Sequence, residues 1–233
     1  MSTVLGFDTA TAATVVGLTR AGREPLQLSH APAAGERPGH AQQLLPLARE
    51  ILEAAGIGFA DIARIGVGVG PGTFTGLRIG VATARALAQS SGAELVGVST
   101  LRALALGALA AGHDGPVLSV LDARRGEAFV AAHAPGDRTG PRTLQTAAAV
   151  APEDLGGQLA QAPGSWLAVG EGAVRFREPL EAAGAFVPQD DSALHRVSAI
   201  AICRLAEAGE TADRDALIPD YVRAPDAELR RPS

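Results

Sequence analysis

The sequence predicts an α/β protein built from two related lobes, and three observations point to this fold class. Apolar runs typical of strands alternate with segments of helical periodicity along the chain. A strand, turn, strand pattern occurs twice, and its first strand ends at Asp8 in one copy and at Asp122, 114 residues later, in the other. A later strand in each half runs into a glycine turn, at Gly70 to Gly72 and at Gly170 to Gly172. The two halves are therefore predicted to be diverged copies of one unit.

The first copy begins with two predicted strands, residues 4 to 7 and residues 14 to 18, joined by a small polar turn at residues 9 to 13. Apolar runs bounded by small and polar residues are typical of a hairpin. The second copy places its strands at residues 117 to 121 and 128 to 132. Strands and helices that alternate in two repeated halves favour two sheets flanked by helices.

We expect the two lobes to comprise residues 1–106 and residues 107–233. An alanine-rich helix ends near this boundary, at Gly112 and Gly115. The second copy is the poorer one, because its glycine turn opens a shorter helical pattern at residues 173 to 180. The second lobe is therefore expected to be the smaller one. Packing of its C-terminal segment back on the first lobe is an open alternative.

Helical periodicity in the first lobe predicts two helices, His40 to Ala55 and Thr75 to Gln89. The first carries an apolar stripe, and the second carries a ridge of small residues, four positions apart, that lets another helix approach closely. Because both helices have more apolar surface than one sheet covers, we expect them to bind a partner. Packing of the ridge inside its own lobe is an equal alternative. The expected interface residues are His40, Leu44, Ala48, Ile51, Ala55, Gly76, Gly80, Ala84 and Ala88.

A glycine-rich loop joins a buried strand to the second of these helices. Glycines permit a tight turn, and free amides at a helix start can bind an anion. Capping of the same amides by a threonine hydroxyl is the alternative, which needs no ligand and which we favour. The loop residues are Gly70, Pro71, Gly72, Thr73, Phe74, Thr75, Gly76 and Arg78.

Asp8 and Asp122 stand at strand ends beside turns, where a phosphate-transferring enzyme holds a metal ion or activates a hydroxyl. Each carboxylate is also placed to accept hydrogen bonds within its own turn, and Asp122 has Arg124 and Arg125 beside it for an ion pair. The sequence contains no lysine, which excludes a Walker-type loop and a Schiff-base lysine. We therefore favour the turn-capping interpretation for both aspartates.

Nothing in the spacing of the five histidines indicates a metal site, because no HxxxH or HExxH pair occurs. We expect no catalytic, cofactor-binding or metal-binding residues. The net charge of −5 argues against unaided binding of nucleic acid. The single cysteine, Cys203, is typical of a reducing compartment, and no signal segment or membrane span is predicted, so we expect a cytoplasmic protein.

The segment HAQQLLP at residues 40 to 46, followed by GPGTFTGLRIG at residues 70 to 80, resembles the TsaB family, which is also called YeaZ. Further matching segments span almost the whole chain. They are VLGFDTA at residues 4 to 10, GVSTLRALA at residues 97 to 105, VLDARRGEAF at residues 120 to 129 and PDYVR at residues 219 to 223.

The resemblance implies a reduced member of the duplicated two-lobe fold shared by actin, sugar kinases and Hsp70. It also implies kinship with TsaD, which transfers a threonylcarbamoyl group to the adenosine beside the anticodon of tRNA. TsaD carries an HxxxH metal motif, and its two positions fall on Thr100 and Leu104 here. Neither side chain can serve as that metal ligand.

The function that the resemblance implies is that of a non-catalytic scaffold, which forms a heterodimer with TsaD through the first-lobe helices. The TsaE ATPase and the TsaC synthase would complete the pathway, and tRNA would be contacted only through the complex. A homodimer in the absence of the partner is a further expectation. Two alternatives stay open: a nucleotide-dependent phosphotransferase that uses Asp8 and the glycine loop, and a glycoprotease-like peptidase.

Overall fold

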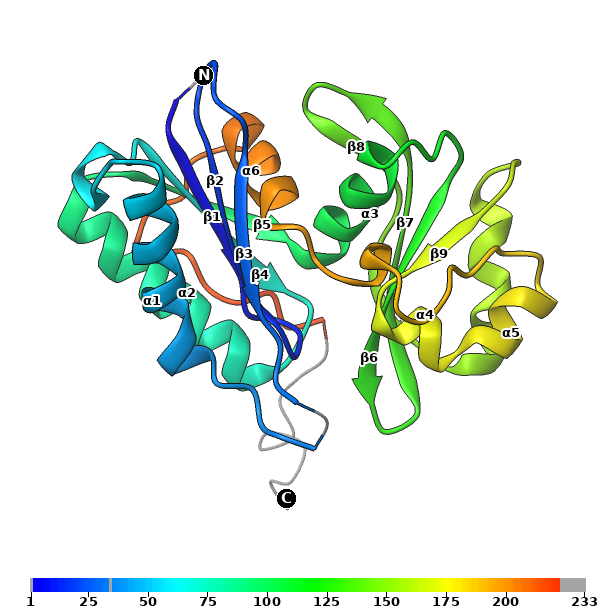
Figure 1. Cartoon of the computed structure of the whole chain (residues 1–233). Coiled ribbons are helices and arrows are strands. Elements are labelled where there is room, and N and C mark those ends of the chain that lie inside the picture. The colour runs from blue at the N-terminus through cyan, green and yellow to red at the C-terminus, as the bar shows by residue number, and fades with distance from the viewer. Residues whose placement is uncertain (1, 34, 223–233) are drawn as a thin grey trace.

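The computed structural model describes residues 2–33 and 35–222, which form two α/β lobes side by side (Figure 1). Arg223, the last residue of the PDYVR segment, and the rest of the expected second lobe to residue 233 lie outside the described residues. None of the helices in these ranges is long and apolar enough to cross a bilayer. The α/β class predicted from the sequence is confirmed.

The first lobe is built on a five-stranded sheet in the order β3-β2-β1-β4-β5. Its strands are β1 (Val4–Asp8), β2 (Thr14–Thr19), β3 (Leu26–His30), β4 (Arg64–Gly70) and β5 (Glu94–Ser99). The first three pair antiparallel, whereas β4 and β5 join parallel to β1. Helices α1 (His40–Ala54) and α2 (Phe74–Ser91) cover the outer face of this sheet (Figure 1).

The second lobe repeats this plan on a four-stranded sheet in the order β8-β7-β6-β9. Its strands are β6 (Val117–Arg124), β7 (Glu127–Asp137), β8 (Gly140–Val150) and β9 (Leu167–Val169). Here β6 and β7 correspond to β1 and β2, and the short parallel β9 corresponds to β4. Two short helices, α4 (Glu171–Arg175) and α5 (Arg177–Ala182), follow β9. The repeat and the reduced second lobe predicted from the sequence are therefore present.

Two helices lie between the sheets, and each packs on the sheet of the opposite half of the chain (Figure 1). Helix α3 (Thr100–Ala110) follows the first sheet but packs against β6, β7 and β8. Helix α6 (Ala199–Ala208) comes near the end of the described chain but packs against β1, β2 and β4. This crossing gives the duplicated two-lobe plan that the resemblance implies. The lobe division expected between residues 106 and 107 falls inside α3.

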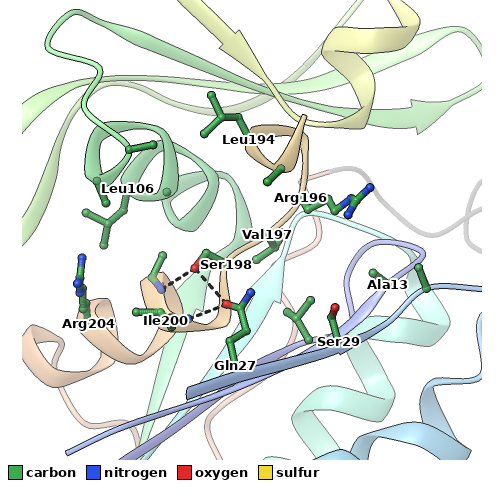
Figure 2. A pocket seen from close by; sticks show the side chains of 17 residues that line it. Ala13, Gln27, Ser29, Leu106, Leu194, Arg196, Val197, Ser198, Ile200 and Arg204 are labelled. Atoms are coloured by element: carbon green, nitrogen blue, oxygen red, sulfur yellow. Dashed lines mark hydrogen bonds between the residues drawn. The ribbon is translucent and has the colours of Figure 1, made fainter. Parts of the chain in front are cut away.

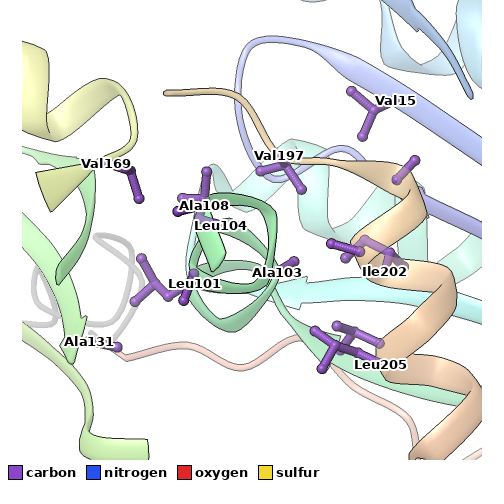
Figure 3. Packing of buried hydrophobic residues seen from close by; sticks show 14 of the residues in the cluster. Val15, Leu101, Ala103, Leu104, Ala108, Ala131, Val169, Val197, Ile202 and Leu205 are labelled. Atoms are coloured by element: carbon purple, nitrogen blue, oxygen red, sulfur yellow. The ribbon is translucent and has the colours of Figure 1, made fainter. Parts of the chain in front are cut away.

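The core between the lobes is centred on α3 and α6, and strands of both sheets complete it (Figure 3). Leu101 and Leu104 of α3 and Ile202 of α6 are 1% exposed or less. A fully buried side chain of this size contributes about 1.5 to 3 kcal/mol through the hydrophobic effect. The two lobes are thus joined by a continuous apolar layer rather than by a linker.

A row of three glycines lets α6 lie close to the first sheet. Gly6 pairs with Gly17 across the antiparallel ladder and with Gly66 across the parallel one, so the three share one level of the sheet. A Cβ atom at Gly6 would come within 2.7 Å of Cys203 Sγ and 2.9 Å of its backbone nitrogen. Side chains at the other two positions would likewise meet α6. The close packing of α6 therefore depends on the absence of side chains along this row.

Candidate functional site

The carboxylate of Asp8 is fully buried at the end of β1. Its Oδ1 accepts a 2.7 Å hydrogen bond from the Ala10 N–H, and its Oδ2 accepts a 2.8 Å bond from the Thr100 hydroxyl of α3. A Cβ atom at Gly68 on the neighbouring strand would overlap Oδ2. The turn-capping interpretation of Asp8 is confirmed, and Thr100 adds a link to α3 that the sequence did not show.

Burial raises the pKa of Asp8, while the hydrogen bonds from Ala10 and Thr100 lower it in part.

The resemblance aligns Thr100 and Leu104 with two metal-binding histidines. Thr100 lies beside the Asp8 carboxylate and donates its hydroxyl hydrogen bond to it. Leu104 is 1% exposed and lies in the core between the lobes. Within the described ranges no three His, Cys, Asp or Glu residues come together as a metal site. The Asp8 carboxylate is therefore buried and links β1 to α3 through Thr100.

Asp122, the counterpart of Asp8, is also engaged within its own turn. Its Oδ1 accepts a 2.8 Å hydrogen bond from the Arg124 N–H, and its Oδ2 lies 2.8 Å from Arg175 and 3.4 Å from the Arg124 guanidinium. Both the turn-capping role and the ion pair with Arg124 considered from the sequence are therefore present.

The glycine loop packs against the turn between β1 and β2. The Thr73 N–H donates a 2.7 Å hydrogen bond to the Ala10 carbonyl, and the peptide bond between Gly70 and Pro71 is cis. Thr73 occupies the N-cap position of α2, but its hydroxyl makes no capping bond, so the predicted hydroxyl cap is wrong for this residue. The loop glycines serve close approach: a Cβ atom at Gly72 would overlap Ala10.

The small-residue ridge of α2 lies inside the first lobe. Gly76, Gly80, Ala84 and Ala88 are all buried. Side chains at the two glycines would collide with Thr9, whose hydroxyl donates a 2.8 Å hydrogen bond to the Gly76 carbonyl. The ridge therefore accommodates the first turn of its own lobe, which is the alternative left open by the sequence.

The apolar stripe of α1 is likewise used by its own sheet. Leu44, Ala48 and Ile51 are 2% exposed or less and belong to the core of the first lobe. The buried His40 joins α1 to the hairpin through a 2.8 Å hydrogen bond between its Nδ1 and Thr14 Oγ1. Ala55 is half-buried at the end of the helix. Eight of the nine residues expected at the interface are thus buried within their own lobe, and Ala55 is the half-buried exception.

The faces of α1 and α2 that turn outward carry other residues. On α1, Leu45 is 44% exposed and shares a shallow hollow with Pro46 and Arg49. On α2, the exposed positions include Thr75, Arg78, Ala82, Ala86 and Gln89. The two helices lie next to each other on the same side of the lobe (Figure 1). Together they offer one continuous outer surface.

An aromatic cluster stands at the start of this surface, and it joins the glycine loop to the PDYVR segment. Phe74 is 40% exposed and stacks on Tyr221 with ring centroids 5.5 Å apart. The Arg78 guanidinium lies 3.8 Å from the centre of the Phe74 ring, and its Nε donates a 3.2 Å hydrogen bond to the Tyr221 hydroxyl. Stacked cations and aromatic rings of this kind are common at interfaces. Both segments stand out in the sequence, but nothing in the sequence predicts their contact.

The chain that leads to Tyr221 is bound along the lobe. The Ala212 N–H donates to the Leu95 carbonyl at 2.8 Å, and the Asp220 N–H donates to the Val69 carbonyl at 2.7 Å. Between these bonds, Leu217 is 8% exposed and packs into the first-lobe core. The segment after α6 therefore returns to the first lobe and fixes Tyr221 beside α2.

Comparison with known proteins gives a consistent picture. A family model described as "TsaD: tRNA N6-adenosine threonylcarbamoyltransferase" matches residues 32–228. A relative from Escherichia coli, named tRNA threonylcarbamoyladenosine biosynthesis protein TsaB, is 34% identical over 169 residues, which are 72% of this chain and 71% of that protein. A relative of the same name from Haemophilus influenzae is 32% identical over 127 residues, 54% of this chain and 52% of that protein.

Solved structures agree with the sequence relatives. YeaZ from Pseudomonas aeruginosa superposes with a TM-score of 0.75 at 27% identity, over 95% of this chain and all of that one. A second structure from that organism, described as similar to peptidase YeaZ, gives 0.77 at 28% identity, over 96% of this chain and all of that one. Fold and matches define the class of TsaD-related two-lobe proteins. Within that class, the chain belongs to the TsaB family.

Proposed function

We propose that this protein is a non-catalytic subunit in the biosynthesis of threonylcarbamoyladenosine in tRNA, and that it acts by binding a TsaD-type transferase. The observation that carries the proposal is the outer surface of α1 and α2, with Leu45 on α1, Phe74 and Arg78 on α2, and Tyr221 packed beside α2. Exposed apolar and aromatic groups gathered on paired helices favour a protein partner. The names of the E. coli and H. influenzae relatives support the pathway.

The burial of Asp8 supports a protein without catalytic activity. A carboxylate that activates a hydroxyl or holds a metal ion has to reach its substrate. Asp8 is 0% exposed, and both of its oxygens already accept hydrogen bonds. Thr100 and Leu104 supply no metal ligand beside it. These features disfavour both the phosphotransferase and the peptidase alternatives.

The partner with the best fit is a protein of the same two-lobe class, since it would offer an equivalent pair of helices. Two such pairs form a four-helix contact, and a stable contact of this kind buries on the order of 1,200 Å² or more. A TsaD-type transferase fits this description, and a second copy of this chain would use the same surface when the transferase is absent. The net charge of −5 supports contact with tRNA only through the complex. A TsaE-type ATPase is a further expected member of that complex, as the resemblance implies.

Co-purification with a TsaD-type transferase tests the proposal. Leu45→Arg on α1 and Ala82→Arg on α2 each place a charge on the outer surface and are expected to remove binding, while melting curves stay unchanged because both positions are exposed. Phe186→Arg is the matched control, since Phe186 is 68% exposed on the second lobe. Wild-type binding by both surface variants would refute the interface.

A second measurement separates the scaffold from an enzyme. The chain alone is expected to show no threonylcarbamoyl transfer, whereas the transferase should gain activity when the chain is added. Turnover by the isolated chain that a chelator abolishes would contradict the proposal.

A further inference from the structure

A cavity of about 500 Å³ opens between the two lobes, and Asp8 is not among its walls (Figure 2). Its sides are β2 and β3 of the first sheet, the C-terminal half of α3, the single turn η4 (Ala193–His195) and the start of α6. Small-molecule sites typically have volumes of about 300 to 1,000 Å³ and lie between domains. The size and place of the cavity therefore suit a small ligand.

Most of the wall is apolar. Val15 comes from β2. Leu106 comes from α3, Leu194 from η4, Val197 from the chain just before α6, and Ile200 from the first turn of α6 (Figure 2). These side chains come from elements on both sides of the cleft, so a ligand that touches them would contact both lobes. The walls favour a ligand with an apolar body.

The polar groups of the wall are mostly hydrogen-bond donors. Gln27 Oε1 accepts 3.2 Å bonds from the Ser198 hydroxyl and from the Ile200 N–H (Figure 2). Because a backbone N–H can only donate, the atom that faces Ile200 must be the amide oxygen. The Gln27 amide nitrogen is thereby turned to the other side and is left to donate to a ligand. The Ser29 hydroxyl lines the same cavity.

The charge of the wall has one sign. No aspartate or glutamate lines the cavity, although the chain has 25 acidic residues, whereas Arg196 and Arg204 both do. Both arginines are exposed, and no carboxylate in residues 2–33 or 35–222 forms an ion pair with either. The N-terminus of α6 opens onto the same space and adds the positive end of its helix dipole. The cavity therefore favours an anion.

We propose that this cavity binds a small molecule with an apolar body and one carboxylate group. The apolar wall buries the body. Arg204 and the Gln27 amide nitrogen are assigned to the carboxylate, whereas Arg196 stands on the opposite side of the cavity (Figure 2). The site is separate from the outer surface of α1 and α2 and from the role proposed for it. A ligand here would connect the two lobes through α3 and α6.

Octanoate and octylammonium are suitable matched probes, because they share an alkyl chain and differ in charge. Octanoate is expected to raise the melting temperature of the protein and to show saturable binding in ligand-observed NMR. Octylammonium is expected to do neither. Equal effects of the two probes, or no effect of octanoate, would overturn the proposal.

Three variants place the binding in this cavity. Gly107 lines it, and a Cβ atom there would have its nearest neighbour at 3.8 Å, so Gly107→Leu is expected to fill the space and abolish octanoate binding. Leucine favours a helix over glycine, so the fold should be retained. Arg204→Gln should weaken octanoate by about three- to fivefold, the size of a solvent-screened ion pair. Arg49→Gln, on the far side of the first lobe, is the control and should bind normally. Octanoate binding that survives Gly107→Leu in a folded protein would refute the site.

Discussion

Replacing Thr100 by valine is expected to destabilise the protein, because it removes the only side-chain donor to the buried Oδ2 of Asp8 among the described residues. Valine keeps the size and branching of threonine, so the loss is mainly that of one hydrogen bond. A buried acceptor left without its donor costs about 1 to 3 kcal/mol. For a protein of this length, that lowers the melting temperature by roughly 2 to 12 °C.

The cost of Thr100→Val should also depend on pH. Burial raises the pKa of Asp8, and the bond from Thr100 opposes this rise. A carboxyl with a raised pKa favours the folded state fully below its unfolded pKa of 3.8, and this contribution is lost as pH rises through the folded value. Without the hydroxyl, the pKa of Asp8 rises further. The destabilisation should therefore be smaller near pH 4 than in an alkaline buffer.

Urea denaturation followed by circular dichroism under both conditions measures this effect. Thr75→Val is the matched control, because Thr75 lies at the start of α2 as Thr100 lies at the start of α3, but is exposed. The control should change the free energy of unfolding by less than about 0.5 kcal/mol. If Thr100→Val changed the free energy of unfolding as little as Thr75→Val, the hydrogen bond between Thr100 and Asp8 would not stabilise the fold.

Three further outcomes are expected. Gly6→Ala places a methyl group against the α6 backbone and should cost about 1 to 3 kcal/mol or more in urea denaturation, whereas Gly157→Ala, with no neighbour within 4 Å, should cost little. Gly80→Trp drives a ring into Thr9 and should abolish cooperative unfolding; a folded variant that loses only its partner would show that the ridge is not internal. Burial lowers the pKa of His133 to about 4, so its imidazole resonances should titrate near that value. The contribution of the neutral imidazole to stability is fully present above the unfolded pKa of 6.5 and should be lost as pH falls from 6.5 through the folded pKa of about 4. A midpoint near 6.5 would contradict that burial.

The fold class could be predicted from local sequence patterns, because strand alternation and helical periodicity are properties of neighbouring residues. The two hairpins, whose first strands were predicted to end at Asp8 and Asp122, and the helix α2 lie where the sequence pattern predicts them, within a few residues. Strand β8 escaped prediction, since its run of alanines and polar residues is only half-buried and has no clear apolar alternation.

The candidate site was harder to predict, because the sequence states what a face is made of and not what covers it. Small residues at Gly76 and Gly80 signal a close approach, but the approaching group is Thr9 of the same lobe rather than another protein. The contact of Phe74 with Tyr221 joins positions more than 140 residues apart, which no local period encodes. The outward faces of α1 and α2 follow from the structure, in which the inner faces of both helices pack on the sheet.

The exchange of α3 and α6 between the lobes has a consequence for synthesis. A chain that emerges from the ribosome from its N-terminus can form all five strands of the first sheet once Ser99 is free. The inner face of that sheet, with its bare row at Gly6, Gly17 and Gly66, has to wait for Ala208 before α6 can cover it. During the synthesis of roughly a hundred residues, about 5 to 20 seconds at typical rates, the nascent first lobe exposes an uncovered sheet. That interval is when a chaperone would find its binding site on this protein.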